Sequence, residues 1–279
     1  MKIQISIKET KQILTKSKLP DANYVINPYL GCIHGCIYCY AEFMRRFSHH
    51  TEPWGKFIEV KQCLDGIDFR RVLPSDTILI GSVTDAYNPL ESKYGITRSL
   101  LRQLSSCTAR IEILTKSKLV CRDIDLIKNI PNIAVGISLN STDDSFRSKI
   151  EPYASTVNER LAALKELHEA GISTYLFAAP LFPGFSNYQE LLQKALAYID
   201  YACFENLSLR GNYKARVLSM VSHEYPEKKE LFDRIYRSND LSSWNEVERD
   251  IRHYCDKLHI PYRIYFHHGS LRANRKEVQ

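Results

Sequence analysis

Three cysteines within eight positions, Cys32, Cys36 and Cys39, are the residues whose spacing most clearly indicates chemistry. They lie in GCIHGCIYCY and follow the pattern C-x3-C-x2-C. A disulfide would use two of these thiols and leave the third unpaired. The same spacing suits three irons of a cubane iron–sulfur cluster, whereas ferredoxin-like electron carriers supply four cysteines. A fourth iron without a protein ligand would make this a reactive site rather than an electron carrier.

Zinc is the alternative metal, since a structural zinc site takes four protein ligands. The fourth ligand could come from His34, His49 or His50. The other five cysteines are single and scattered, which favours buried thiols in a reducing compartment over a disulfide framework. They are Cys63, Cys107, Cys121, Cys203 and Cys255.

The elements that must position the cysteine triad alternate between β-rich and helical segments. We predict strands at 23–29, 77–83, 109–116, 132–140, 172–180 and 204–211. The helical segment VNERLAALKELHEAG ends at Gly171, a residue suited to a helix C-terminus. Such alternation predicts an α/β fold with a parallel sheet, closed or partly closed into a barrel. The cysteines directly follow the first strand, at the edge where such barrels carry their chemistry.

Three segments divide the chain of 279 residues. We expect an N-terminal extension at 1–20, a core barrel at 21–217, and a helical C-terminal extension at 218–279 that packs on the barrel. The formal net charge of +6 permits a polyanionic partner without requiring one. No apolar run approaches the roughly 18 residues of a membrane span, and MKIQISIKETKQ lacks the apolar region of a signal peptide. We therefore expect a cytoplasmic protein without membrane association.

The cysteine motif after a first strand, with Tyr38 before the last cysteine, resembles the signature of the radical S-adenosylmethionine (SAM) superfamily. More narrowly, NPYLGCIHGCIYCYAEF resembles the spore photoproduct lyase-like (DNA repair photolyase-like) branch. The resemblance implies a partial (β/α)6 TIM-type barrel with a [4Fe-4S] cluster on Cys32, Cys36 and Cys39. It also implies reductive cleavage of SAM to a 5′-deoxyadenosyl radical that abstracts hydrogen from a substrate, with an electron from a reductant such as flavodoxin or ferredoxin.

Four further segments match that branch and imply contacts to SAM. They are GSVTDAYNPLE, LTKS, GISLNS and FAAP. Tyr38 and Ala179 would contact the adenine, Lys116 the carboxylate, and Ser138 with Asn140 the ribose or carboxylate, while Thr84 and Asp85 would be further contacts. A zwitterionic nucleoside needs one cation, hydroxyl partners and a small apolar wall, which this set supplies. Alternatively, Lys116 is a solvated lysine, Asp85 a turn residue, and Ser138 a strand-end cap.

One position departs from the lyase pattern. The lyases carry a hydrogen-donating cysteine three residues before the aspartate of that loop, and this chain has Ser82 there. The O–H bond of serine is too strong to donate a hydrogen atom readily. We therefore expect a reaction other than cleavage of spore photoproduct.

The segment SLRGNYKARVL, after the last strand, is the candidate substrate region. Arg210, Lys214 and Arg216 surround Tyr213, a combination that suits phosphate contact and base stacking. The tail SLRANRKE adds positive charge, and a solvated basic loop is the alternative. Nucleic acid is the leading substrate class by family analogy. A protein or small-metabolite substrate, or a non-catalytic zinc-stabilised nucleic-acid-binding protein, are the competing hypotheses.

Overall fold

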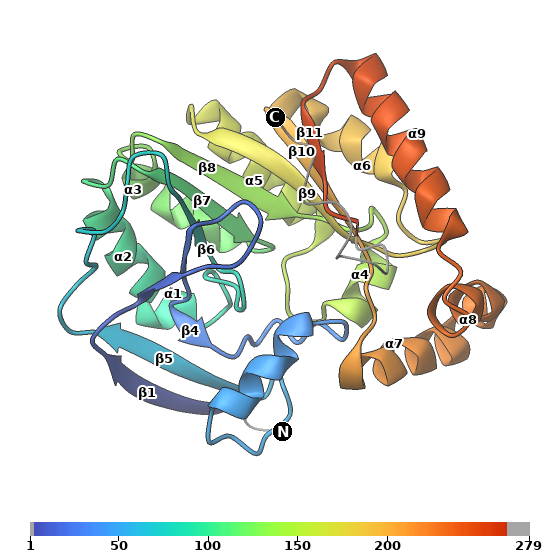
Figure 1. The fold of residues 1–279 in the computed structure, drawn as a ribbon, viewed down its shortest axis with the longest axis horizontal. Helices are drawn as coiled ribbons and strands as arrows, with labels where there is room; N and C mark the ends of the chain where they lie inside the picture. Colours follow the sequence, from blue (N-terminus) through green and yellow to red (C-terminus); the bar gives the residue numbers. More distant parts are fainter. Residues whose placement is uncertain (1–2, 267–279) are drawn as a thin grey trace.

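An eight-stranded sheet dominates the computed structural model, which describes residues 3–266 (Figure 1). The strand order is β11-β10-β9-β8-β7-β6-β3-β2, and only β2 and β3 pair antiparallel. The strands are β2 (Leu14–Lys16), β3 (Tyr24–Ile26), β6 (Thr77–Ile80), β7 (Arg110–Thr115), β8 (Ile133–Ser138), β9 (Ser173–Leu181), β10 (Tyr201–Asn206) and β11 (Tyr262–Ile264).

The predicted fold class is confirmed. Six strands, from β3 through β10, lie side by side in chain order and form a partial (β/α)6 barrel. Within residues 3–266 no pairing joins the edge strands β2 and β11, so the barrel is open. The last of the six strands, β10, ends at Asn206, whereas the sequence predicted a strand at 204–211. The predicted strand is too long at this end because the apolar pattern continues beyond β10 with the buried Leu207 and Leu209.

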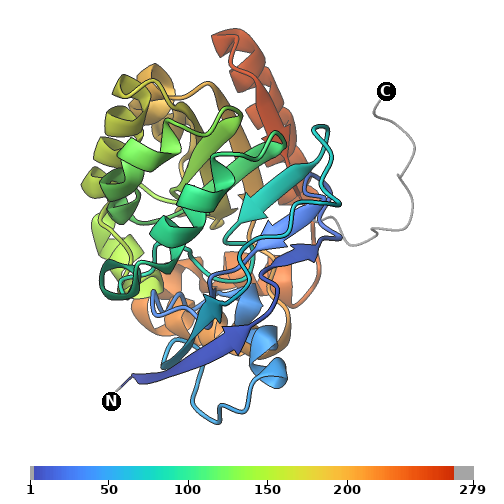
Figure 2. The ribbon, with the colours of Figure 1, turned by 90° about the vertical axis from the view of Figure 1, so that its left-hand side faces the viewer.

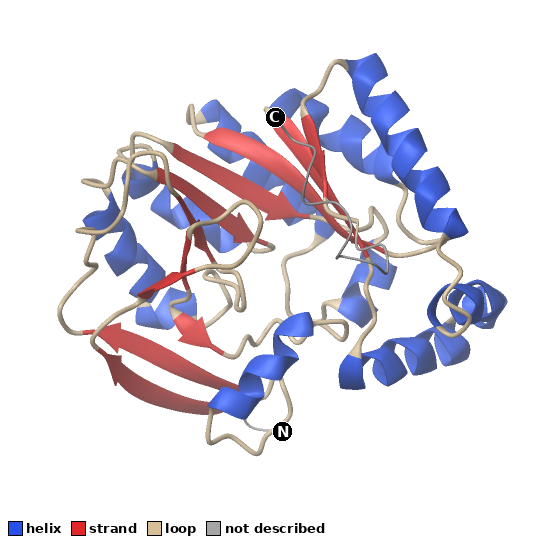
Figure 3. Cartoon of the chain, viewed as in Figure 1, coloured by secondary structure: helices blue, strands red, loops and turns tan. Residues whose placement is uncertain are grey.

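Helices pack along the outer side of the sheet, and the main apolar core lies between the two layers (Figures 2 and 3). Helix α5 (Val157–Glu169) begins with a capping box in which Thr156 and Glu159 satisfy each other's backbone N–H groups. The last residue of α5 is Glu169, and Gly171, with a φ of +78°, follows the C-cap Ala170 as the helix-terminating glycine that the sequence predicts. The other helical segments are α1 (Glu91–Tyr94), α2 (Ile96–Leu104), η2 (Lys118–Asp123), α3 (Ile124–Ile127), α4 (Asp144–Ile150), α6 (Tyr188–Ala195), η3 (Leu196–Tyr198) and η4 (Pro226–Lys228).

A second, three-stranded sheet was not predicted. Strand β5 (Phe57–Cys63) lies between β1 (Gln4–Thr10), which is parallel to it, and β4 (Tyr29–Leu30), which is antiparallel. The alternating isoleucines at 3, 5 and 7 carry a period-two signal for β1. Residues 1–20 thus contain β1 of this sheet and β2 of the main sheet.

Between β10 and residue 266, where the described part of the chain ends, the main elements are three α-helices and a strand. Helices α7 (Gly211–Glu224) and α8 (Lys229–Tyr236) lie below the strand ends, while α9 (Ser242–Leu258) runs beside α6 and leads to β11 on the edge of the main sheet (Figure 1). Among the helices of residues 3–266, none is long and apolar enough to cross a bilayer.

Candidate active site

The cysteine loop follows β4 and leads into the helical segment η1 (Tyr40–Phe47). Its entry requires glycine, because Gly31 has a φ of +92° and a Cβ there would lie 2.5 Å from the carbonyl oxygen of Phe57. Cys32 and Cys36 are buried, Cys39 is half-buried, and all three thiols are free. The loop therefore presents three unpaired sulfurs from a backbone packed directly against β5.

Hydrogen bonds hold this loop from two sides. The hydroxyl of Thr84, after β6, donates to the carbonyl of Gly31 at 2.6 Å. On the other side, the amide of Ile37 donates to the carbonyl of Ile150, the last residue of α4, at 3.0 Å. The amide of Tyr153, which follows α4, donates to the carbonyl of His34 at 3.2 Å. Residues from the second and fourth strand ends of the barrel thus fix the cysteine loop in place.

The triad fits an iron–sulfur cluster by its donor chemistry. Burial raises the pKa of the Cys32 thiol to about 12, and the carboxylate of Asp85 and the neighbouring Cys39 add to this rise. Burial also raises the pKa of Cys36 and Cys39. Neutral buried thiols need a cation to become thiolates, and soft thiolate ligands select iron–sulfur clusters or zinc.

The histidines proposed for a zinc site have other contacts. Nδ1 of the buried His34 lies 3.4 Å from a carboxylate oxygen of Asp85. His50 stacks on Phe57, with 4.3 Å between ring centroids, and His49 is exposed. In residues 3–266, no group of three or more His, Cys, Asp or Glu side chains is gathered to hold a single metal ion.

A buried carboxylate that the sequence did not single out organises the predicted SAM contacts. Glu151 follows α4 and is fully buried. Its Oε1 accepts hydrogen bonds from Lys116 Nζ at 3.2 Å, from Asn140 Nδ2 at 3.1 Å and from the hydroxyl of Tyr38. Lys116 Nζ also lies 3.4 Å from Ser138 Oγ. The side chains of four predicted SAM contacts therefore lie close together around Glu151. They are Tyr38, Lys116, Ser138 and Asn140.

A buried arginine supports this carboxylate from α5. Arg160 is fully buried and pairs with Oε2 of Glu151. Its other nitrogens donate to the carbonyls of Ser138 at 3.0 Å and Ser155 at 2.9 Å. Neither Glu151 nor Arg160 has a sequence signal that separates it from the many solvated charges of the chain, because only the fold buries them.

The charges of this network stabilise each other. Burial alone would raise the pKa of Glu151, but Arg160 and Lys116 outweigh it and hold that pKa at about 2. Burial disfavours the ammonium of Lys116, yet the carboxylate of Glu151 raises its pKa above the usual lysine value. Lys116 is thus a half-buried cation directly after β7.

Asp85 and Thr84 have their side-chain oxygens engaged within the protein. Asp85 accepts from Thr115 Oγ1 at 2.7 Å and from the amides of Tyr87 at 2.8 Å and Lys116 at 2.9 Å. It therefore ties the loop after β6 to the end of β7. In this structure both residues shape the loops around the cysteines, and Asp85 also forms the turn that the alternative interpretation described.

Ala179 and Ser82 lie at the ends of two strands, β9 and β6, that are separated in the sheet by β8 and β7. Ala179 is buried near the end of β9, and its carbonyl accepts from Ser138 Oγ at 3.1 Å. Ser82, after β6, accepts from Asn27 Nδ2 at 3.0 Å, and its carbonyl accepts from the hydroxyl of Tyr40. The side chain in the lyase cysteine position is therefore a hydrogen-bonded hydroxyl.

The four candidate substrate residues lie at and within the start of α7 rather than on a loop. Tyr213 is buried in an apolar cluster and donates to the carbonyl of Ser208. Lys214 donates to the carbonyl of Tyr236, and Arg216 pairs with Glu42 of η1. Arg210 is exposed at the residue before the helix. The structure thus leaves Tyr213 without an open ring face, and the basic tail lies outside the described residues.

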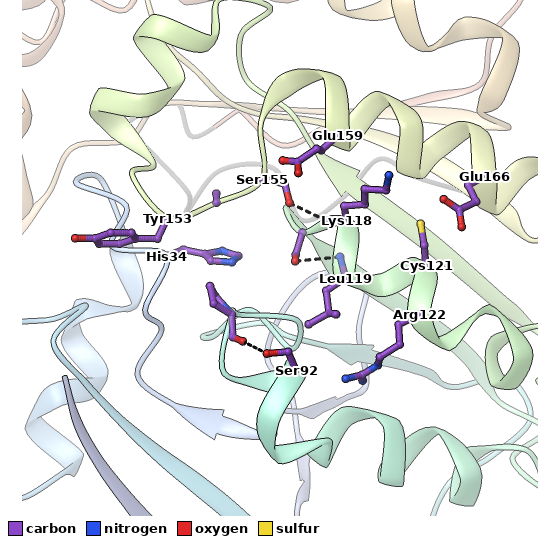
Figure 4. Close-up of a pocket in the computed structure, with 13 residues that line it drawn as sticks. His34, Ser92, Lys118, Leu119, Cys121, Arg122, Tyr153, Ser155, Glu159 and Glu166 are labelled. Carbon is purple, nitrogen blue, oxygen red and sulfur yellow. Dashed lines mark hydrogen bonds between the residues drawn. The ribbon is translucent and has the colours of Figure 1, made fainter. Parts of the chain in front are cut away.

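A groove of about 670 Å³ is lined by residues of the cysteine loop, of the segment after β7 and of α5 (Figure 4). His34 and Tyr153 border one end of it and Cys121 with Glu166 the other. Burial, aided by the carboxylate of Glu166, raises the pKa of Cys121 to about 12, so this thiol is neutral and unreactive at pH 7.

Comparison with known proteins matches the barrel to a family. The model of the Radical SAM superfamily matches residues 26–194. An uncharacterized protein of Methanocaldococcus jannaschii is 34% identical over 230 residues, which cover 82% of this chain and 87% of that protein. A radical SAM Nalpha-GlyT isomerase of Pseudomonas phage M6 is 24% identical over 215 residues, 75% of this chain and 42% of that protein.

Solved structures of spore photoproduct lyase share the fold. A cysteine-to-serine mutant of the lyase aligns with a TM-score of 0.68 at 20% identity and covers 94% of this chain and 82% of that chain. A double mutant of the lyase with bound AdoMet and dinucleoside spore photoproduct has a TM-score of 0.65 at 18% identity, with the same coverage. The resemblance to the lyase-like branch is confirmed at the level of fold.

Proposed function

Since the chain belongs to the Radical SAM superfamily, we propose that Cys32, Cys36 and Cys39 hold a [4Fe-4S] cluster with which the enzyme cleaves SAM to a 5′-deoxyadenosyl radical. That radical abstracts hydrogen from a nucleic acid or nucleotide. The carrying observation is the juxtaposition of three free cysteines with the half-buried ammonium of Lys116 at the strand ends of one barrel. When bound, the cluster supplies the electron for cleavage and an open iron for the amino and carboxylate groups of SAM.

The side chains around Glu151 supply binding and orientation. Lys116 binds the carboxylate of SAM, because it is a half-buried cation whose only charged hydrogen-bond acceptor in residues 3–266 is Glu151. Asn140 has a buried side-chain oxygen that finds no hydrogen-bond partner among residues 3–266, and this oxygen can accept from a ribose hydroxyl. The side chains of Tyr38 and Ala179 contact the adenine. Burial of this pocket excludes water from the radical.

Two observations support a nucleic-acid substrate. The lyase structure contains a dinucleoside, and the charge of +6 is compatible with a polyanion. Ser82 in place of the lyase cysteine argues against spore photoproduct as the substrate, because a hydroxyl is a poor hydrogen-atom donor. The external electron comes from a small reductant such as flavodoxin or ferredoxin.

Isotope transfer tests the substrate class. Anaerobically reconstituted enzyme with dithionite and SAM is incubated with perdeuterated DNA, perdeuterated RNA or a deuterated cell extract freed of nucleic acid, and the 5′-deoxyadenosine is analysed by mass spectrometry. We expect deuterium in the product from a nucleic-acid arm. Deuterium from the extract alone would contradict the nucleic-acid assignment while leaving SAM cleavage intact.

A further inference from the structure

The outer face of η1 carries an unusual concentration of exposed aromatic side chains. In residues 3–266, four aromatic side chains are exposed, and three of them lie on this one short segment. Tyr40, Phe43 and Phe47 are 52%, 43% and 59% exposed. The inner face of the segment is apolar in the ordinary way, because Ala41 and Met44 pack on the core beside Cys39. The exposed rings of Phe43 and Phe47 are therefore not required to hold η1 in place.

Cations accompany these rings. The guanidinium of Arg46 lies over the rings of Phe43 and Phe47, 5.3 and 4.7 Å from their centroids. No ion pair joins Arg45 or Arg46 to an acid in the described part of the chain. The acid of the segment, Glu42, is already neutralised by Arg216. The face thus combines open ring surfaces with uncompensated positive charge.

The position of this face connects it to the proposed active site. Cys39 directly precedes η1, and the hydroxyl of Tyr40 donates to the carbonyl of Ser82 at the end of β6. Figure 1 shows η1 beside the open strand ends of the barrel. A polymer bound along η1 would therefore pass the entrance to the site.

We propose that the outer face of η1 binds single-stranded DNA, with bases stacked on Phe43 and Phe47 and phosphates paired with Arg45 and Arg46. Aromatic rings with interleaved cations bind single strands because every base offers a π-face and every nucleotide a negative charge. The assignment of a nucleic acid to this face rests on the proposed function. Binding is measured without turnover, so its failure is distinct from failure of the chemistry.

The test compares Phe43→Leu/Phe47→Leu with the wild type, because leucine keeps the apolar surface but removes the stacking faces. Fluorescence anisotropy of a labelled mixed-sequence 12-nucleotide DNA is recorded with reconstituted full-length protein. We expect the dissociation constant to rise at least tenfold. The control, Leu64→Ala/Leu73→Ala, alters two equally exposed apolar side chains elsewhere and should bind as the wild type does. Melting temperature and iron content verify that each variant is folded and loaded.

The charge component is tested separately with Arg46→Gln. We expect the slope of log Kd against log salt concentration to fall by about one, as for the loss of one phosphate contact. Arg70→Gln is the matched control, since Arg70 is exposed but already paired with Asp68. An unchanged slope in Arg46→Gln would remove the assignment of that arginine to a phosphate.

Three outcomes would overturn the proposal. Wild-type protein that does not bind the DNA, or a double leucine variant that binds it normally, contradicts a stacking face on η1. Tighter binding of an RNA of the same sequence contradicts the choice of DNA. If the double variant binds DNA normally and loses only flavodoxin-driven, not dithionite-driven, SAM cleavage, the face docks a protein reductant instead.

Discussion

At the scale of single residues, the site depends on the ion pair between a half-buried lysine, Lys116, and a fully buried acid, Glu151. Lys116 Nζ and Glu151 Oε1 are 3.2 Å apart, and Arg160 gives the carboxylate a second cation. Lys116 and Arg160 carry two positive charges against the single negative charge of Glu151, so one positive charge remains for an anionic ligand. Lys116 therefore differs from the nearby Lys118, which is exposed.

Replacing Lys116 with alanine should weaken SAM binding at least tenfold, because the variant loses the half-buried cation for the ligand carboxylate. Iron content should not change, since Lys116 is not a cluster ligand. Isothermal titration of reconstituted protein with SAM measures the affinity, and Lys118→Ala is the matched control. Equal SAM affinity in Lys116→Ala and Lys118→Ala would refute the assignment of Lys116.

The pKa of Glu151, lowered from near 4.5 to about 2, corresponds to about 3 kcal/mol of stability. Because the folded-state pKa is the lower one, this contribution is complete above about pH 4.5 and is lost as the pH falls towards 2. Glu151→Gln should therefore be about 3 kcal/mol less stable at pH 7, with a difference that shrinks below pH 4.5.

Urea unfolding of the apoprotein at several pH values measures this contribution. The control variant Glu230→Gln changes an exposed carboxylate and should follow the wild type throughout. A stability gap between wild type and Glu151→Gln that stayed constant from pH 6 to pH 3 would show that Glu151 is not held ionised by its partners.

At the scale of elements, the strands of the main sheet bring residues distant in the sequence to one edge. Apolar segments that alternate with helical segments predicted these strands, because parallel strands buried on both faces have continuous hydrophobic sequences. The β1-β5-β4 sheet was missed, since most of β1 is exposed and the sequence shows no partner for it. Yet β5 is the surface against which the cysteine loop turns, so this small sheet also positions the site.

Gly31 is the residue at which that turn should fail. Gly31→Ala introduces a Cβ 2.5 Å from the Phe57 carbonyl at a φ of +92°, so the loop must shift. We expect a loss of about 2–4 kcal/mol of unfolding free energy, from left-handed strain plus overpacking, and reduced iron loading. Chemical denaturation and iron analysis measure both.

Gly95→Ala is the matched control, because Gly95 also has a positive φ, +62°, but no atom lies within 4 Å of an added Cβ. It should lose only about 1 kcal/mol and retain iron. Similar losses in the two variants would show that the contact with β5 does not constrain the cysteine loop.

At the scale of the whole molecule, the partial barrel and its cysteine motif could be predicted from the sequence, because both are patterns local to the chain. The network of Glu151 and Arg160 could not, since burial of a charge is decided by tertiary packing alone. The candidate substrate residues show the same limit. Tyr213 has an aromatic side chain between basic residues in the sequence, but helix α7 turns it into the core.

The most direct test of the central claim is whether the reconstituted chain forms 5′-deoxyadenosine from SAM under anaerobic reduction with dithionite. We predict product from the wild type and from Cys121→Ala, whose thiol lies in the outer groove, and none from Cys36→Ala, which lacks a cluster ligand. Product from Cys36→Ala at the wild-type rate, or none from a wild-type protein that has bound iron and sulfide, would contradict the account.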